Sequence, residues 1–213
     1  MKLQLNRFLV LKIILYSTLI YFIYLLVLIT LQYVPINDEV AFLNLKQEEI
    51  KLTYYKYAFF LHVYSSILVI IAGITQFSKT LRRQFSYIHK LSGKIYVLLI
   101  LVLASPSGFI MALHSNGNNS THISFCILSI LWFFFTLKAY LSIKKGNYQQ
   151  HKNFMIRSYA LTLSAISLRL FKYWIVTIFE LPPMDTYNIV AILGWTVNLA
   201  IAEIIIIGQR YYT

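Results

Sequence analysis

The 213-residue sequence predicts an all-α, polytopic integral membrane protein: a bundle of six transmembrane helices with both termini on the cytoplasmic side. Three observations support this prediction. The chain is 59% apolar and only 12% charged, with a mean hydropathy of +0.67, whereas a soluble domain averages about 25% charged residues. The apolar residues form six long continuous runs. The charged residues fall between these runs in an alternating pattern.

Each run is long enough for a helix to cross a bilayer, which takes roughly 20 mostly apolar residues. The runs lack the ten-residue alternation of barrel strands, so helices are expected. The first run is too long for the apolar core of a signal peptide and no small-residue cleavage site follows it, so we expect it to remain as a helix. The expected spans are residues 8–33, 57–77, 94–113, 122–143, 154–179 and 187–208.

The net charge of +12 acts first as an orientation signal. Alternate loops hold most of the 19 Lys and Arg residues, whereas the opposite loops, around residues 35–56 and 180–185, are acidic. Cytoplasmic loops are enriched in Lys and Arg, so both termini are expected in the cytoplasm of a bacterial inner membrane, with the lipid bilayer as partner. The scattered basic residues exclude a nucleic-acid surface, and the single cysteine, Cys126, excludes an internal disulfide framework.

Two parts of the chain are expected. Residues 1–56 form the first transmembrane helix and an acidic outer loop, whose amphipathic portion is expected to lie along the outer surface as a short helix. Residues 57–213 form a five-helix membrane domain. A phosphate-binding glycine loop, a nucleophile elbow and a zinc-binding helix motif are all missing from the sequence, which argues against the soluble enzyme classes that use them.

Polar residues recur on single faces of the expected helices. Polar groups are costly in lipid, so these faces must contact protein or water and form a polar seam within the bundle. Small hydroxylated residues such as Ser158 are expected to serve close helix packing. The other seam residues are Gln76, Arg82, Tyr96, Met155, Asn198 and Glu203.

Four histidines form two pairs, one at each membrane face. His62 and His122 lie at the outer ends of the second and fourth spans, and His89 and His151 lie at the inner ends of the third and fifth. A b-type haem with two axial imidazoles requires such a placement, with His62, His89 and His151 as the expected iron ligands. The layout resembles that of cytochrome b561-type electron carriers. The alternative is that these are ordinary interfacial histidines. Basic residues available to haem propionates are Arg82, Arg83, Lys90, Arg157, Arg169 and Lys172.

Arg169 is the deepest cation in the sequence. It lies roughly ten residues from the outer end of its span, about 15 Å by helix rise, and Lys172 follows one turn further out. The sequence offers no acid at that depth, because Glu203 belongs to the cytoplasmic half. We therefore expect carbonyls, water or an anionic group beside Arg169.

Three functions remain open from the residues alone. The first is a membrane electron-transfer protein that holds b-type haem or a quinone and contacts a redox partner. The second is a small transporter or proton-coupled carrier, with Arg169, Lys172 and Glu203 along the path. Against it, Pro106 is the one clear helix break and has no counterpart in a second half. The third is a structural or assembly protein without chemistry, in which case the protein is not an enzyme.

Several motifs occur together within residues 57–207: His62, the runs 73–77, 82–83, 88–96, 151–161 and 168–170, and Trp195, Asn198 and Glu203. These motifs resemble a bacterial membrane family, domain of unknown function 2306. The resemblance implies a compact multi-helix membrane domain without an assigned reaction. It supports a functional role for His62, Gln76, Arg82, His89, Tyr96, His151, Met155, Arg157, Arg169 and Glu203. It does not extend to His122. His62 is thereby left without a partner, which favours either the absence of haem or a quinone head group near His62.

Overall fold

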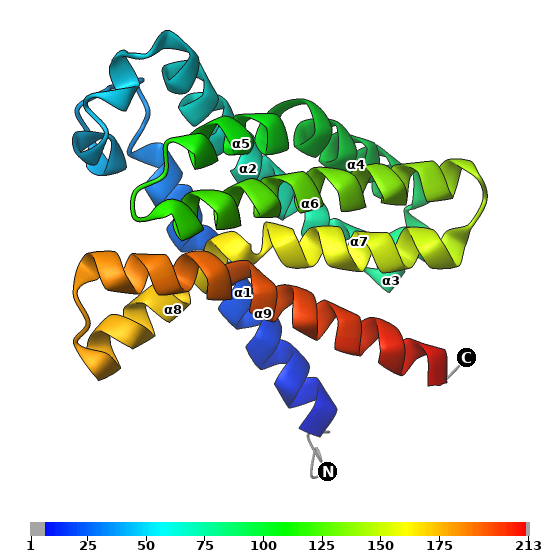
Figure 1. Ribbon diagram of the computed structural model, residues 1–213. Coiled ribbons are helices and arrows are strands. Elements are labelled where there is room, and N and C mark those ends of the chain that lie inside the picture. The colour runs from blue at the N-terminus through cyan, green and yellow to red at the C-terminus, as the bar shows by residue number, and fades with distance from the viewer. Residues whose placement is uncertain (1–6, 212–213) are drawn as a thin grey trace.

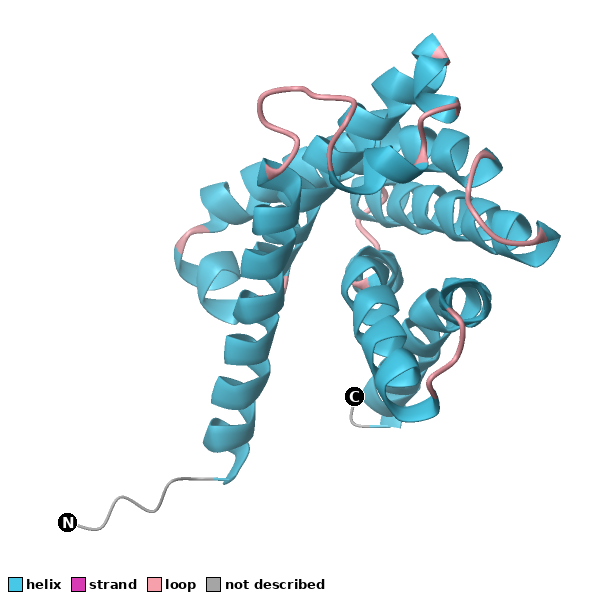
Figure 2. Cartoon of the chain, turned by 90° about the vertical axis from the view of Figure 1, so that its left-hand side faces the viewer, coloured by secondary structure: helices cyan, strands magenta, loops and turns pink. Residues whose placement is uncertain are grey.

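The computed structural model describes residues 7–211, and this part of the chain is helical, without strands (Figures 1 and 2). Five of its helices are long and apolar enough to cross a membrane, and the bent pair α7–α8 makes a sixth span if counted as one. The α-helices are α1 (Arg7–Leu31), α2 (Thr53–Gln76), α3 (Lys79–Gln84), α4 (Ser86–Leu98), α5 (Ser105–Leu113), α6 (Asn119–Lys144), α7 (Tyr148–Thr162), α8 (Ser164–Phe179) and α9 (Pro183–Tyr211). The loop after α1 adds two short 3-10 helices, η1 (Ala41–Leu45) and η2 (Glu49–Lys51), and the π-helical segment η3 (Leu99–Ala104) joins α4 to α5.

The core lies among α2, α4–α5, α6 and α7. Helices α2 and α6 each pack against both α4 and α7, so α4 and α7 are diagonal partners across a four-helix arrangement. Val69, Tyr96, Trp132 and Met155 are buried at its centre. Gly73 permits the close approach of α2 to α7, because a Cβ there would overlap the Tyr159 ring.

The third span is longer than expected. It begins at Ser86 rather than at residue 94 and continues to Leu113, so Pro106 does not interrupt it. Proline lacks the N–H that an α-helix needs, and the π-helical turns of η3 precede it. The carbonyl of Ala104 accepts hydrogen bonds from His62 Nδ1 (2.8 Å) and Ser107 Oγ (3.2 Å). Side chains therefore stabilise the widened turn. The sequence predicted a break at Pro106 because these hydrogen bonds come partly from another helix.

The fifth span, expected as one helix over 154–179, is instead bent by 42° between α7 and α8, at Leu163. The bend interrupts the hydrogen-bond ladder and frees carbonyls at the end of α7. Asn198 of α9 fills this gap: its Nδ2 donates to the Ala160 carbonyl (3.1 Å), and its Oδ1 accepts from Ser167 Oγ of α8 (2.8 Å). Asn198 thus joins both sides of the bend, a role that its own helix does not reveal.

Residues 32–52 form a packed cap at one end of the bundle, in place of the amphipathic surface helix expected there. Leu43 and Ile50 are buried with Tyr33, Tyr55 and Phe59 against the first turns of α2. We call this the cap end. The opposite end, where α3 and the α6–α7 turn lie, is called the basic end. The first half of α1 extends away from the other helices (Figures 1 and 2), and few of its residues are buried.

Candidate functional site

A hydrogen-bonded cluster occupies the centre of the four-helix core. Tyr96 Oη of α4 bonds to Ser158 Oγ (2.8 Å) and Thr162 Oγ1 (3.0 Å) of α7. Trp132 Nε1 of α6 donates to Thr162 Oγ1 (3.0 Å), and Thr136 Oγ1 bonds to Ser158 Oγ (2.7 Å). All five side chains are buried. Because its polar groups bond one another, this cluster specifies how the helices pack.

The Tyr96–Ser158 contact determines the register of the two histidines at the basic end. Helices α4 and α7 both start at the basic end, so they run in the same direction. His89 precedes Tyr96 by seven residues and His151 precedes Ser158 by seven. Seven residues are close to two full turns, which returns to nearly the same face of a helix about 10 Å away. His89 and His151 therefore lie on facing sides of α4 and α7 at one level, and their side chains interact electrostatically.

Each of the two imidazoles has unused bonding capacity. His151 Nδ1 lies 2.9 Å from the Ala139 carbonyl; a carbonyl only accepts, so Nδ1 carries the proton and Nε2 keeps its lone pair when the ring is neutral. This arrangement is typical of histidines that ligate metals. The Nδ1 atom of His89 is buried without a hydrogen-bond partner. A buried polar atom in that state calls for an explanation, and a missing ligand is one.

Basic side chains surround the pair. Arg82 and Lys90 both interact electrostatically with His89, and both are exposed at the basic end. Gln76 of α2 joins the region to the core, since its Nε2 donates to Ser92 Oγ (2.7 Å) and its side chain fills the space beside Gly93. Met155 is buried one turn above His151. The sequence-predicted inner residues thus come together at this end.

The cap-end histidines are not brought together in the same way. His62 Nδ1 bonds to the Ala104 carbonyl, whereas His122 Nδ1 bonds to the Leu113 carbonyl (3.3 Å) of the same span. Nine residues of helix separate these carbonyls, about 13 Å along the axis. The two imidazoles lie at different depths, so the geometry does not place both on one iron.

Arg157 pairs with Glu203, a contact that connects α7 to α9. Its Nε and Nη2 donate to the two carboxylate oxygens at 2.5 and 2.7 Å, a bidentate arrangement, and its guanidinium lies over the Phe154 and Phe135 rings. Arg157 therefore does not simply extend to the lipid interface. Glu203 of α9 is bonded to Arg157 of α7, whereas Arg169 and Lys172 lie on α8.

Arg169 lies on α8 near the cap-end histidine. Its Nη1 donates to the Ala165 carbonyl of its own helix (2.7 Å), and its charge interacts with His62 and Tyr33. Its side chain and that of Lys172 are exposed. No described ion pair joins either residue to a carboxylate. The Ala165 carbonyl is one of the kinds of group expected beside Arg169.

Lys46, a residue that the sequence did not single out, is 1% exposed in the cap. Its Nζ donates to Glu49 Oε1 (2.7 Å) and to the His114 carbonyl (2.6 Å), while Tyr54 Oη bonds to His114 Nε2 (2.9 Å). The Lys46–Glu49 spacing of three residues was the available signal. It was missed because lysine in an acidic loop is ordinarily exposed.

Residues 7–211 contain no group of three or more His, Cys, Asp or Glu side chains placed to hold a metal ion. The strongest candidate site is the facing pair His89 and His151, with Arg82 and Lys90 beside it. These two imidazoles are the groups that could hold a cofactor at this end.

Comparison with known proteins is consistent with this picture at the family level. No curated protein and no solved structure matches the chain. A family model described as a predicted membrane protein, DUF2306, matches residues 59–206. The match includes both histidines of the candidate site, the central hydrogen-bonded cluster and the Arg157–Glu203 pair. The chain therefore belongs to the DUF2306 family of predicted membrane proteins.

Proposed function

We propose that this membrane protein is a b-type haem protein of the electron-transfer class, with one haem ligated by His89 and His151. The observation that carries the proposal is the register of the two histidines, each two turns from the Tyr96–Ser158 hydrogen bond on parallel, diagonal helices. His89 and His151 face each other across the helical bundle and would hold the haem iron between them. A haem held in this way would supply the transfer of single electrons.

The surrounding residues supply the other requirements of a haem site. The Ala139 carbonyl holds the His151 ring in the tautomer whose Nε2 lone pair is free for iron. Arg82 and Lys90 provide positive charge for the two propionates at the bundle end. We further propose that the basic end faces the cytoplasm of a bacterial inner membrane, from the excess of Lys and Arg at that end.

The test is a reduced-minus-oxidised absorbance spectrum of the purified full-length protein, expressed with added haem precursor. We expect a b-type band in the wild type and its loss in His89→Ala and His151→Ala. His114→Ala is the matched control, because that imidazole is bonded to Tyr54 at the opposite end. Absence of the band from well-folded wild-type protein contradicts the proposal, and so does its full retention in both site variants.

A quinone site at the cap end is the second candidate function, favoured by the electrostatic contact of Arg169 with His62. A quinone carbonyl accepts hydrogen bonds, which the Arg169 guanidinium can donate. His62 Nδ1 is bonded to the Ala104 carbonyl, so His62 Nε2 can accept a hydrogen bond from the hydroxyl of the reduced quinone. Such a site would exchange electrons with the haem proposed above. Arg169→Gln should then keep the haem band but slow the oxidation of reduced haem by a short-chain quinone. An unchanged oxidation rate contradicts this assignment.

A further inference from the structure

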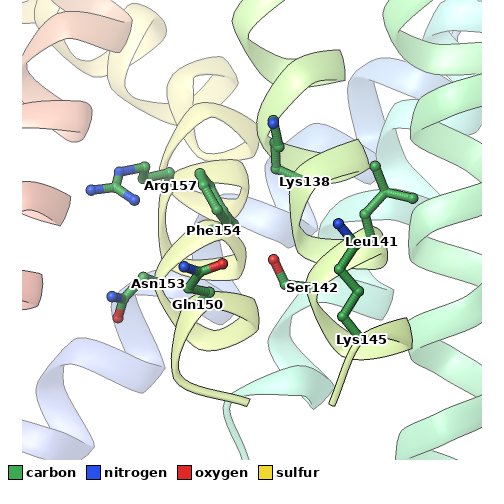
Figure 3. Close-up of a pocket in the computed structure, with 8 residues that line it drawn as sticks. All are labelled: Lys138, Leu141, Ser142, Lys145, Gln150, Asn153, Phe154 and Arg157. Atoms are coloured by element: carbon green, nitrogen blue, oxygen red, sulfur yellow. The ribbon is translucent and has the colours of Figure 1, made fainter. Parts of the chain in front are cut away.

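A pocket of about 440 Å³ lies between α6 and α7 at the basic end, and the proposed haem site does not use it (Figure 3). It spans the last two turns of α6 and the first turns of α7, at the level where a transmembrane helix leaves the membrane. The side chains that matter for its chemistry are Lys138, Ser142 and Lys145 from α6 and Gln150, Asn153 and Arg157 from α7.

The pocket lining is positively charged. It contains three cations and no acid. The Arg157 guanidinium is neutralised by Glu203, which leaves the ammonium groups of Lys138 and Lys145. Neither lysine belongs to any ion pair in the part of the chain that the structure describes. An anion is therefore the ligand that would balance the charge of this pocket.

Neutral donors accompany the two lysines. The Ser142 side chain is buried and its hydroxyl is directed toward the gap between the two helices (Figure 3). The Gln150 side chain also lines the pocket and lies on the α6 side of α7 in the same view (Figure 3), whereas the Asn153 amide is directed away from α6. Hydroxyl and amide donors next to ammonium groups match the several acceptor oxygens of a phosphate.

An apolar stripe continues from the pocket toward the middle of the membrane. Positions 130, 134, 138 and 141 follow one face of α6 at helical spacing. Ile130, Phe134 and Leu141 on this face are 55%, 43% and 41% exposed, and Lys138 Nζ lies 5.4 Å from the Phe134 ring centroid. Cations therefore lie at the membrane surface, and exposed apolar side chains lie deeper. This order matches a phospholipid, whose phosphate lies at the interface and whose acyl chain lies below it.

We propose that this pocket binds the phosphate head group of an anionic phospholipid from the adjacent leaflet. Lys138 and Lys145 neutralise the phosphate, Ser142 and Gln150 donate hydrogen bonds to its oxygens, and one acyl chain lies along Phe134 and Ile130. Basic pockets between transmembrane helices at the membrane surface are a known type of lipid site. The inference does not depend on the haem, because the residues it uses are distinct from the histidines and from Arg82 and Lys90.

The experiment measures the thermal stabilisation of the full-length protein in detergent as phosphatidylglycerol is added, with phosphatidylcholine and inorganic phosphate as separate arms. We expect phosphatidylglycerol to stabilise the wild type at lower concentration than phosphatidylcholine does. The double variant Lys138→Gln/Lys145→Gln should need about thirtyfold more phosphatidylglycerol for the same shift, since each nearby lysine contributes about 1 kcal/mol to binding anionic lipid.

Lys144→Gln is the matched control. Lys144 lies on the same turns of α6 and also contacts an aromatic ring, Tyr140, but it does not line the pocket. It should respond to phosphatidylglycerol as the wild type does. Equal responses to the two lipids overturn the proposal, as does an equal loss in Lys144→Gln. Stabilisation by inorganic phosphate that matches phosphatidylglycerol also overturns it, because the occupant would then be a soluble anion. The haem spectrum of the double variant should be unchanged, which keeps this result separate from the haem test.

Discussion

At the cap end of the bundle, the lysines of the loop are paired with acids, whereas the basic end presents lysines and two histidines without acids beside them. Lys46 and Lys51 of the cap bond to Glu49 and Glu48, and Lys56 in the first turn of α2 bonds to Asp38. At the basic end the described ion pair is Arg157–Glu203. A base with an acid beside it completes a structural contact within the protein. A base without one leaves charge for a ligand, a lipid or water to balance.

The histidines show the same contrast. His114, which follows α5 at the cap end, is bonded through its ring to Tyr54 and through its carbonyl to Lys46. His89 at the other end keeps a buried ring nitrogen without a partner. The comparison teaches that residue type alone does not identify a functional site in a membrane protein. Unused bonding capacity is the better guide, and the cap end also holds two buried oxygens without a hydrogen-bond partner, at Asp38 and Ser115.

The largest expected effect is on the buried ion pair of the cap. Lys46→Met should destabilise the protein by about 3 kcal/mol, because it leaves the His114 carbonyl and Glu49 without their partner. Lys51→Met is the matched control, with the same three-residue spacing to an acid but 68% exposure, and should cost under about 0.5 kcal/mol. Thermal melts in detergent measure both. Equal losses in the two variants would remove the distinction between buried and exposed pairs at this end.

The next effect concerns the core that joins the two ends. Gly73→Ala should destabilise by about 2 kcal/mol, because the added Cβ overlaps the ring of Tyr159 in a packed interior. Gly208→Ala is the control, since nothing lies within 4 Å of the corresponding Cβ. Helix propensity alone predicts that both substitutions stabilise. Opposite signs in the melts confirm the close contact, and two stabilising results contradict it.

A smaller effect is the response of the cap to acid. Burial raises the pKa of Glu49, but the hydrogen bond from Lys46, a backbone hydrogen bond and the charges of Lys46 and His114 together outweigh it and hold the pKa below its usual value. A carboxylate with a lowered folded-state pKa stabilises fully above its unfolded pKa, about 4.3, and that contribution is lost as pH falls through the folded value. We expect the melting temperature to fall below about pH 4, and less steeply in Glu49→Gln. Identical pH profiles would show that Glu49 does not contribute.

The smallest effect on stability is expected at the basic end. Arg82→Gln removes an exposed cation that has no acid partner among the described residues, so its cost should be under about 0.5 kcal/mol. Melts in detergent without anionic lipid measure this cost. A loss as large as that of Lys46→Met would mean that the basic end also depends on its charges for folding, and the contrast between the two ends would fail.

Much of the architecture was predictable because lipid imposes simple rules. A helix satisfies its own backbone, so long apolar runs predict helices at nearly the observed positions. The Leu163 bend was not predictable, because it depends on Asn198 of another helix. The cap was also missed, since an amphipathic pattern shows that one face is buried but not whether protein or membrane covers it.

The candidate site divides in the same way. His89 and His151 were placed at one membrane face by counting residues along their spans. The pairing of Arg157 with Glu203, 46 positions apart, and the burial of Lys46 required the packed structure. The lysines of the lipid pocket were recognised only as orientation signals, because a charge in a loop has no visible partner until the helices are assembled.

The sequence by itself determined that this is a helical membrane protein of the DUF2306 family, with its cations concentrated in alternate loops. These properties follow from the free energy of transferring single side chains and backbone segments from water to lipid. This free energy depends only on local sequence. Only the tertiary structure decided which polar groups are satisfied and which remain open. Hydrogen bonds and ion pairs join helices that are distant in sequence, so the open groups at His89, His151, Lys138 and Lys145 become visible only after every neighbour is in place.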